Sequence, residues 1–154
     1  MGGLKNIRRP TRAAAAATRR RQAVLFLCVA NSARSQMAEG IARRTAPRGV
    51  RVFSAGSRPG GLNPLAAEAM AEIGIDISGH ASKEISAIPG DEVDTVVFLC
   101  AEEVCPLFPA RVQRIHWPLP DPGAVRGSHQ KRMAAFRRVR TELHLRIGAL
   151  MEML

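Results

Sequence analysis

The sequence places a short apolar run directly before a turn of small polar residues and a helical pattern, and this order restricts the fold more than any other feature. Residues 22–29 read QAVLFLCV, a run that is almost entirely apolar rather than alternating. Such a run is typical of a strand that is buried on both faces, as in a parallel sheet. The turn ANSARS covers residues 30–35, and residues 36–45 have helical spacing of apolar side chains. We therefore expect a strand, a tight turn and a helix that returns over the sheet.

The alternation of strands and helices continues along the chain. Further strands are expected at 50–55, 94–100 and 111–117, and further helices at 63–72, 82–88 and 130–153. This order predicts an α/β fold: a four-stranded parallel sheet with helices on both faces, joined by right-handed connections. Active sites of such folds lie at the carboxyl ends of the strands. That edge would bring together the loop after the first strand, Cys100 and the loop that contains Asp121.

Residues 22–154 are expected to form one domain, and residues 1–21 a basic, disordered extension without a catalytic role. Seven of the 23 Lys and Arg residues lie in this extension, which has no Asp or Glu, so 16 basic and 13 acidic residues remain in the domain. With one Trp, five Phe and no Tyr, the domain offers little for base stacking, which argues against nucleic-acid binding. No apolar stretch reaches the ~20 residues of a membrane span or resembles a secretory signal. We therefore expect a cytoplasmic monomer that does not bind membranes.

Cys28 and Arg34 are separated by five residues at the turn after the first strand. Small residues allow successive backbone N–H groups to point inward and bind an anion, and a helix that begins near Ser35 adds its positive end. The guanidinium of Arg34 suits two oxygens of a tetrahedral oxyanion. The same donors would favour an ionised Cys28 sulfur, which would then be a nucleophile aimed at the bound central atom. We call this segment the oxyanion loop: Val29, Ala30, Asn31, Ser32, Ala33, Arg34 and Ser35.

The spacing alone is weak evidence, because a buried core cysteine followed by a surface arginine gives the same pattern. The position between a strand and a helix favours the functional interpretation. Asn31 can hold the loop through hydrogen bonds to the backbone, and the Ser35 hydroxyl can donate to the Cys28 sulfur. Cys100 and Cys105 can also be interpreted as two buried apolar residues that only pack in the core. Asp121, in the segment LPDPG, can also be interpreted as an ordinary turn residue.

Five segments occur in a specific order: LFLCVANSARSQMAEG, FSAGSRPGGLNP, IDISGHASKEI, DTVVFLCAEEVCP and HWPLPDPG. Together they resemble the arsenate reductases that are built on the low-molecular-weight tyrosine phosphatase fold. The resemblance covers residues 22–150, which is nearly all of the expected domain. Arsenate and phosphate are both tetrahedral and similarly charged, so the oxyanion loop by itself would accept either anion.

The resemblance implies a relay of three cysteines. Cys28 would attack arsenate and form a covalent arsenic adduct, and Cys100 would attack the Cys28 sulfur, which releases arsenite and leaves a Cys28–Cys100 disulfide. Cys105 would then replace Cys28 in this disulfide, and the resulting Cys100–Cys105 disulfide would be reduced by a partner. The resemblance also assigns to Asp121 the general acid that protonates the leaving oxygen. The partner would be thioredoxin, or glutathione with glutaredoxin, because the gap between Cys100 and Cys105 is shorter than in the best-known thioredoxin-linked members.

Glu39 and Ser54 match positions that support the oxyanion loop and, in some relatives, a potassium site. Three residues after His80, where these relatives have an acid, this sequence has Lys83, whose ammonium could replace a bound cation in bracing Asn31. Four His and three Cys residues form no zinc-like cluster in the sequence, and we expect neither a metal nor an organic cofactor. The histidines are expected to be structural or surface residues: His80, His116, His129 and His144.

Two other classes of function remain open at this point. The first is a phosphatase that hydrolyses phosphotyrosine through a Cys28 phospho-enzyme. The absence of any Tyr argues against it, because phosphatase members usually flank the substrate ring with aromatic residues beside the acid. The second is a non-enzymatic oxyanion sensor or arsenical-binding protein, which would bind without forming a product.

Overall fold

The computed structural model describes residues 22–101, 106–108 and 111–154. The strands are β1 (Ala23–Cys28), β2 (Arg51–Gly56), β3 (Thr95–Phe98) and β4 (Gln113–His116). The α-helices are α2 (Arg34–Thr45), α3 (Pro64–Ala71) and α4 (His129–Met153), and the 3-10 helices are η1 (Ile85–Ala87), η2 (Gly90–Glu92) and η3 (Pro122–Ala124). The expected extension at 1–21 lies outside the described residues.

The four strands form one parallel sheet in the order β2-β1-β3-β4. The interior strand β1 is buried at every position, as its continuous apolar run predicts. In the register of the sheet, Cys28 pairs with Gly56 of β2, and Leu27 pairs with Phe98 of β3. The predicted α/β fold with a four-stranded parallel sheet is confirmed, and the carboxyl ends of these three strands meet at one edge.

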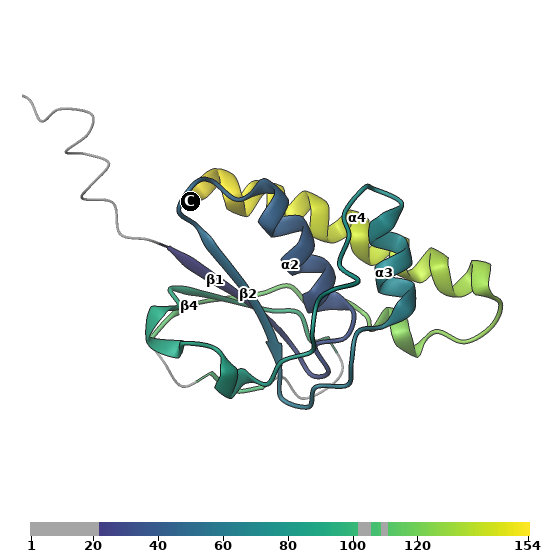
Figure 1. Ribbon diagram of the computed structural model, residues 1–154, viewed down its shortest axis with the longest axis horizontal. Coiled ribbons are helices and arrows are strands. Elements are labelled where there is room, and N and C mark those ends of the chain that lie inside the picture. The colour runs from purple at the N-terminus through teal and green to yellow at the C-terminus, as the bar shows by residue number, and fades with distance from the viewer. Residues whose placement is uncertain (1–21, 102–105, 109–110) are drawn as a thin grey trace, which may run out of the picture.

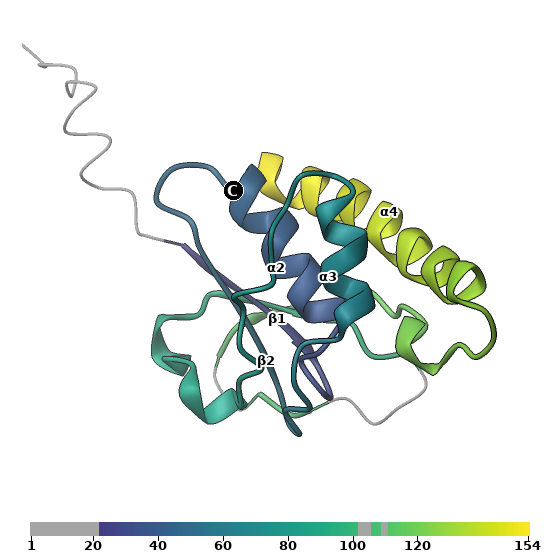
Figure 2. The same cartoon turned by 45° about the vertical axis from the view of Figure 1, so that its right-hand side comes forward.

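The two faces of the sheet are covered differently. Helices α2, α3 and α4 pack together on one face, where they bury Val24 and Phe26 (Figures 1 and 2). The alternate side chains Leu25 and Leu27 point to the other face and meet Phe108 there. Apolar residues from the segment around η1 and η2 complete this second cluster: Ile85, Ile88 and Val93. Helical segments therefore lie on both faces, but within the described residues those on the second face are single 3-10 turns.

The change of face follows from the direction in which the chain crosses the sheet. From β1 to β2 the chain moves toward one edge, and from β2 through β3 to β4 it moves toward the other. Right-handed connections that run in opposite directions lie on opposite faces. The connection from β2 to β3 nevertheless begins with α3 on the same face as α2, and it reaches the second face only around η1 and η2. The connections after β1 and β3 thus diverge, and ligands of such sheets bind in the crevice that this divergence opens. Cys28 ends β1 and Cys100 follows β3, so both lie at this crevice.

Residues 82–88 do not form the predicted helix. Glu84 makes an isolated parallel bridge with Gly56, and only η1 is helical in this stretch. The carbonyl of Lys83 accepts a hydrogen bond from the Gly56 N–H, and the Lys83 N–H donates to Asn31 Oδ1. The prediction was wrong because β2 and the oxyanion loop satisfy backbone groups that a helix would otherwise have used.

Helix α4 carries the apolar stripe that its sequence predicts and packs against α2 and α3. The stripe consists of Met133, Phe136, Val139, Leu143, Ile147, Leu150 and Met151. Glu72, at the end of α3, binds Arg137 and Arg140 of α4, and these hydrogen bonds lower the pKa of Glu72 to about 2. The ion pairs that join α3 to α4 are therefore intact at neutral pH. Among the described residues, no helix is both long and apolar enough to cross a membrane.

Candidate active site

The oxyanion loop is held from outside through its carbonyl oxygens. The segment 58–63 donates backbone N–H groups to three of these carbonyls, each at 2.9 Å. The pairs are Arg58 with Val29, Gly60 with Ala30, and Asn63 with Ser32. In a trans peptide the N–H points away from the C=O, so carbonyls that are held outward leave the N–H groups directed into the loop. This arrangement of successive N–H groups binds anions.

Gly56, the last residue of β2, allows the strand to lie directly against the oxyanion loop. A Cβ atom at this position would be 2.3 Å from the Val29 carbonyl oxygen and 2.8 Å from the Asn31 backbone nitrogen. Both distances are far below van der Waals contact, so a side chain here would displace the loop backbone. The absence of a side chain at Gly56 therefore contributes to the shape of the anion site.

Cys28 lies at the base of the loop with 2% of its surface exposed. Its Sγ atom is 2.9 Å from the Ser35 Oγ. The Ser35 oxygen accepts a hydrogen bond from Asn31 Nδ2 at 2.8 Å, so its own proton is available to the sulfur. Because α2 begins at Arg34, the positive end of this helix also lies in the loop. The Cys28 sulfur thus receives an O–H donor beside the N-terminal end of α2.

Asn31 holds the shape of the loop from within. It is fully buried, and its φ of 46° is a left-handed conformation that residues other than glycine seldom adopt. Its Nδ2 donates to Ser35 and, at 3.0 Å, to the Ser54 Oγ. Its Oδ1 accepts from Gln36 Nε2 at 3.0 Å and from the Lys83 N–H at 2.8 Å. The backbone Lys83 N–H must be a donor, which settles the orientation of the Asn31 carboxamide.

Glu39 supports this network with a carboxylate that is 3% exposed. The Ser54 hydroxyl donates to Glu39 Oε2 at 3.2 Å, and Arg43 and His80 approach the carboxylate to 3.0 and 3.1 Å. The Lys83 ammonium lies 3.9 Å from the same oxygen. The lysine that was expected to brace Asn31 through its ammonium therefore reaches Glu39 with the ammonium and Asn31 with its backbone N–H.

Burial lowers the pKa of His80, and the neighbouring Glu39 carboxylate raises this pKa by a smaller amount. Arg43 and Lys83 lower this pKa further, and Asp76 raises it. The ring is therefore neutral at neutral pH. The charge of Glu39 is balanced there by Arg43 and Lys83 rather than by His80.

Arg34 connects the oxyanion loop to the two other segments at this edge of the sheet. Its side chain is buried, and its Nη1 donates to the Leu119 carbonyl at 3.0 Å and to the Leu99 carbonyl at 3.4 Å. Leu99 precedes Cys100, and Leu119 lies two residues before Asp121. The arginine, the first residue of α2, therefore joins this helix to the ends of both segments.

Cys100 and Asp121 are the outer members of the expected site. Cys100 is buried, with 6% of its surface exposed, and Asp121 is exposed and accepts a hydrogen bond from the Gly123 N–H at 2.9 Å. Cys105 lies outside the described residues. The structure thus gathers Cys28, Asn31, Arg34 and Ser35 into one cluster, with Cys100 and Asp121 on segments that Arg34 contacts.

Sequence reasoning missed three residues that shape this site. Gly56 lies against the loop backbone, Gln36 binds Asn31, and the Ser82 hydroxyl donates to the carbonyls of Ala30 and Asn31. The glycine that directly follows a predicted strand was a usable signal. The other two had none, because a polar residue in a helix or a loop is ordinarily exposed.

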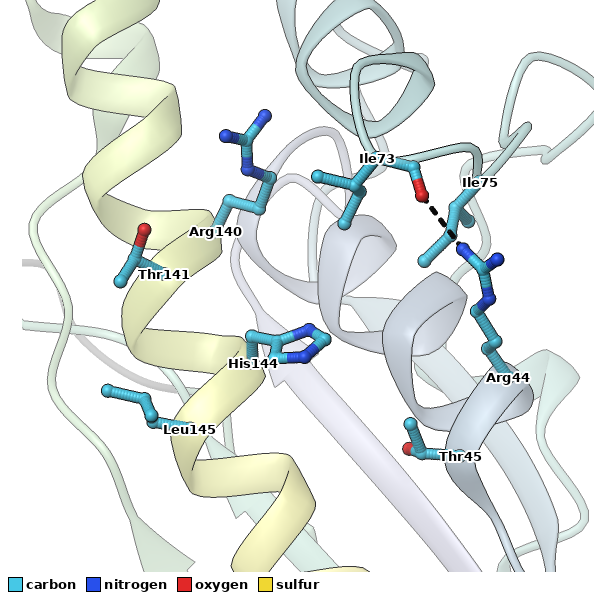
Figure 3. Close-up of a pocket in the computed structure, with 8 residues that line it drawn as sticks. All are labelled: Arg44, Thr45, Ile73, Ile75, Arg140, Thr141, His144 and Leu145. Atoms are coloured by element: carbon cyan, nitrogen blue, oxygen red, sulfur yellow. Dashed lines mark hydrogen bonds between the residues drawn. The ribbon is translucent and has the colours of Figure 1, made fainter.

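One apolar cavity beside α4 lies away from these residues. It has a volume of about 450 Å³, and Figure 3 shows His144 pointing into it from α4, toward α2. The residues that line it are Arg44, Thr45, Ile73, Ile75, Arg140, Thr141, His144 and Leu145. Arg44 and Arg140 donate to the backbone carbonyls of Ile73 and Ala69, so they stabilise the fold around the cavity. Elsewhere in the described ranges, no group of three His, Cys, Asp or Glu side chains could hold a metal ion.

Known proteins resemble this chain in both sequence and fold. An arsenate reductase of Halalkalibacterium halodurans is 42% identical over 134 residues, which is 86% of this chain and 96% of the relative. The solved structure of an arsenate reductase in the phosphate binding state has a TM-score of 0.73 and 34% identity, and covers 85% of this chain and 97% of that one. A thioredoxin-dependent arsenate reductase of Corynebacterium glutamicum has a TM-score of 0.65 and 28% identity, and covers 90% of this chain and 63% of that one.

The family comparison agrees with these relatives. Residues 23–154 match the family described as low molecular weight phosphotyrosine protein phosphatase. The match covers every described strand and helix, and it confirms the predicted resemblance. The chain therefore belongs to the low molecular weight phosphotyrosine protein phosphatase family.

Proposed function

We propose that this protein reduces arsenate to arsenite, with Cys28 as the nucleophile. The observation that carries this proposal is the position of Cys100 at the carboxyl end of β3, beside the strand that ends in Cys28. A phosphatase needs one thiol at its anion site, whereas a two-electron reduction needs a second thiol within reach of the first. The names of the relatives support the same function.

The first step binds the oxyanion and forms a sulfur–arsenic bond. The inward N–H groups and Arg34 hold three arsenate oxygens, and the Ser35 O–H donates to the Cys28 sulfur beside the N-terminus of α2. The thiolate attacks arsenic, and the fourth oxygen leaves as water with a proton from Asp121. Asp121 is exposed at the edge of the site, where solvent can reprotonate it.

The second step reduces arsenic and oxidises the cysteines. The Cys100 thiolate attacks the Cys28 sulfur, and the electron pair of the sulfur–arsenic bond goes to arsenic. Arsenite is released, and a Cys28–Cys100 disulfide remains. Cys105 then attacks the Cys100 sulfur, which frees the Cys28 thiolate and forms a Cys100–Cys105 disulfide. A protein dithiol supplies the two electrons that return this disulfide to two thiols. No step needs a metal or an organic cofactor.

The reductant is a thioredoxin or a glutaredoxin with glutathione, and the thioredoxin-dependent relative favours the first. A transient disulfide fits the reducing cytoplasm, which we propose as the location of the protein. Phosphate, which shares the shape and charge of arsenate, is expected to compete for the oxyanion loop. Arsenite formation with each reductant in turn identifies the electron donor.

Replacing Cys100 with serine tests the reduction against phosphatase activity. We expect Cys100→Ser to lose at least about 100-fold in steady-state arsenite formation, because a hydroxyl cannot take part in the disulfide that releases arsenite. Colorimetric measurement of arsenite with thioredoxin and thioredoxin reductase present gives the rate. Hydrolysis of para-nitrophenyl phosphate, which needs only the Cys28 site, is the control.

The two activities separate the candidate functions. A Cys100→Ser protein with the parental rate of arsenite formation would contradict the relay. A parent protein that hydrolyses the aryl phosphate but forms no arsenite would be a phosphatase. Tight arsenate binding with neither product would identify an oxyanion-binding protein.

We expect arsenate reduction to be independent of potassium. The Lys83 ammonium lies 3.9 Å from Glu39 Oε2, where it balances the charge that a bound cation would otherwise balance. Rates in potassium and tetramethylammonium salts at equal ionic strength should agree for the parent, and potassium should stimulate Lys83→Met. Strong stimulation of the parent by potassium would show that the ammonium does not take the place of a cation.

A further inference from the structure

We propose that the cavity between α2 and α4 is a binding site for small aromatic carboxylates, separate from the oxyanion loop. Its volume of about 450 Å³ is within the range of about 300–1,000 Å³ that is typical of pockets for small molecules. The lining comes from the end of α2, from the turn after α3 and from α4. Arg34 begins α2 at the oxyanion loop and Arg44 lies near its other end, so the two sites are about 15 Å apart along this helix.

Two isoleucines give the cavity its apolar surface. Ile73 and Ile75 are half-buried, and Figure 3 shows them between Arg44 and His144. Gly74, which separates them, has a φ of 76°, a left-handed conformation that glycine adopts without strain. The exposed His144 points into the same space from α4. An imidazole ring beside aliphatic side chains suits a flat aromatic ligand, because aromatic rings stack on one another.

Arg44 supplies a positive charge at the edge of this apolar surface. Its Nη1 donates to the Ile73 carbonyl at 2.8 Å, the contact that is dashed in Figure 3, and this holds the guanidinium beside the isoleucines. No carboxylate of the described residues forms a salt bridge with Arg44, and the lining contains no Asp or Glu. Arg140, in contrast, is paired with Glu72. The other N–H groups of Arg44 are therefore donors for the anionic group of a ligand.

The combination of apolar surface and unbalanced charge restricts the chemistry of the ligand. A neutral apolar molecule would leave the guanidinium without a partner, and an inorganic anion would leave the isoleucines in contact with water. A carboxylate joined to an aromatic ring satisfies both parts of the cavity. The probe 4-phenylbutyrate has this chemistry, and the uncharged 4-phenylbutyramide has the same ring and chain.

Calorimetric titration with 4-phenylbutyrate tests the site, in saturating phosphate so that the oxyanion loop is occupied. We expect a Kd of about 10⁻³ M or tighter, as is typical of a ligand of this size. The amide should bind about tenfold more weakly, because it lacks the charge-assisted hydrogen bond to Arg44. Amide chemical shifts should change at residues 73–75. Shifts confined to the oxyanion loop, or a Kd above about 10⁻² M, would overturn the proposal.

The variant Arg44→Met tests the role of the charge. It keeps most of the length of the side chain and removes the guanidinium, so the carboxylate and the amide should bind with equal Kd. Arg48→Met is the matched control, since Arg48 is an exposed arginine that does not line the cavity. This control should keep the tenfold difference between the two probes. A tenfold difference that persists in Arg44→Met would refute the assigned contact.

The variant His144→Trp tests the apolar part of the cavity. His144 is exposed, so the fold should tolerate the larger ring, which would occupy the space into which His144 points. We expect the Kd for 4-phenylbutyrate to rise at least about tenfold with an unchanged melting temperature. An unchanged Kd would overturn the proposal. A parent dimer in sedimentation velocity that His144→Trp dissociates would identify a contact between two copies of the chain, and would also overturn it. These measurements do not involve Cys28, so they are independent of the proposed arsenate reduction.

Discussion

Replacing Cys28 with serine will reduce arsenite formation to the uncatalysed background, a loss of at least about 10⁴-fold. The reduction transfers two electrons from sulfur to arsenic and ends in a disulfide, and a serine hydroxyl can form no such bond. Serine is smaller than cysteine and can still accept the hydrogen bond that Ser35 offers at this position. The measurement is arsenite released per minute with excess arsenate and a saturating reductant.

Two controls make this result specific for chemistry. Phosphate should bind to Cys28→Ser with an affinity close to that of the parent, because the N–H groups and Arg34 are unchanged. The melting temperature should also stay the same, since the substitution removes no large apolar group. A folded Cys28→Ser protein that still forms arsenite at a measurable rate would show that another residue is the nucleophile.

Replacing Gly56 with alanine will lower kcat/KM for arsenate about 100-fold, although this residue contacts no substrate. The added Cβ would lie 2.3 Å from the Val29 carbonyl oxygen, so the loop backbone must move away from β2. A displacement of about 1 Å in a positioned site typically costs this much in rate. The same strain should lower the free energy of unfolding by about 1–3 kcal/mol. Steady-state kinetics and denaturant titration measure the two effects.

Gly79→Ala is the matched control for this substitution. No atom lies within 4 Å of the position that a Cβ of residue 79 would take, and this glycine does not have a left-handed backbone. Its activity and stability should stay close to those of the parent. Equal kinetics for Gly56→Ala and the parent would mean that the loop tolerates a side chain at the end of β2, and the close approach would not shape the anion site.

Much of the site was predictable because its parts are close in sequence. Cys28, Asn31, Arg34 and Ser35 lie within eight residues that join a strand to a helix. Local rules of strand burial, turn composition and helix polarity were sufficient to predict an anion loop with a cysteine at its base. The resemblance to a known family then supplied the expected roles of Cys100 and Asp121, which remain proposals.

The residues that were misjudged depend on contacts across the fold. Residues 82–88 have enough helical character to suggest a helix, but Glu84 pairs with Gly56 in β2, and this contact joins residues that are far apart in the sequence. Gln36 reads as an ordinary polar residue in a helix, yet it is fully buried and binds Asn31 and Ala81. A pattern of neighbouring residues carries no information about a partner that the chain brings in from a distant strand or loop.

The sequence by itself determined the order of the four strands and of α2, α3 and α4, the parallel sheet and the placement of a cysteine at the base of an anion loop. These features follow from the burial of each segment and from the conformations that its own residues allow. Only the tertiary structure decided that α2, α3 and α4 share one face, and that Gly56, Gln36 and His80 surround the loop. The physical reason is that close packing and the pairing of buried polar groups depend on which segments meet in space, and that meeting is a property of the whole chain.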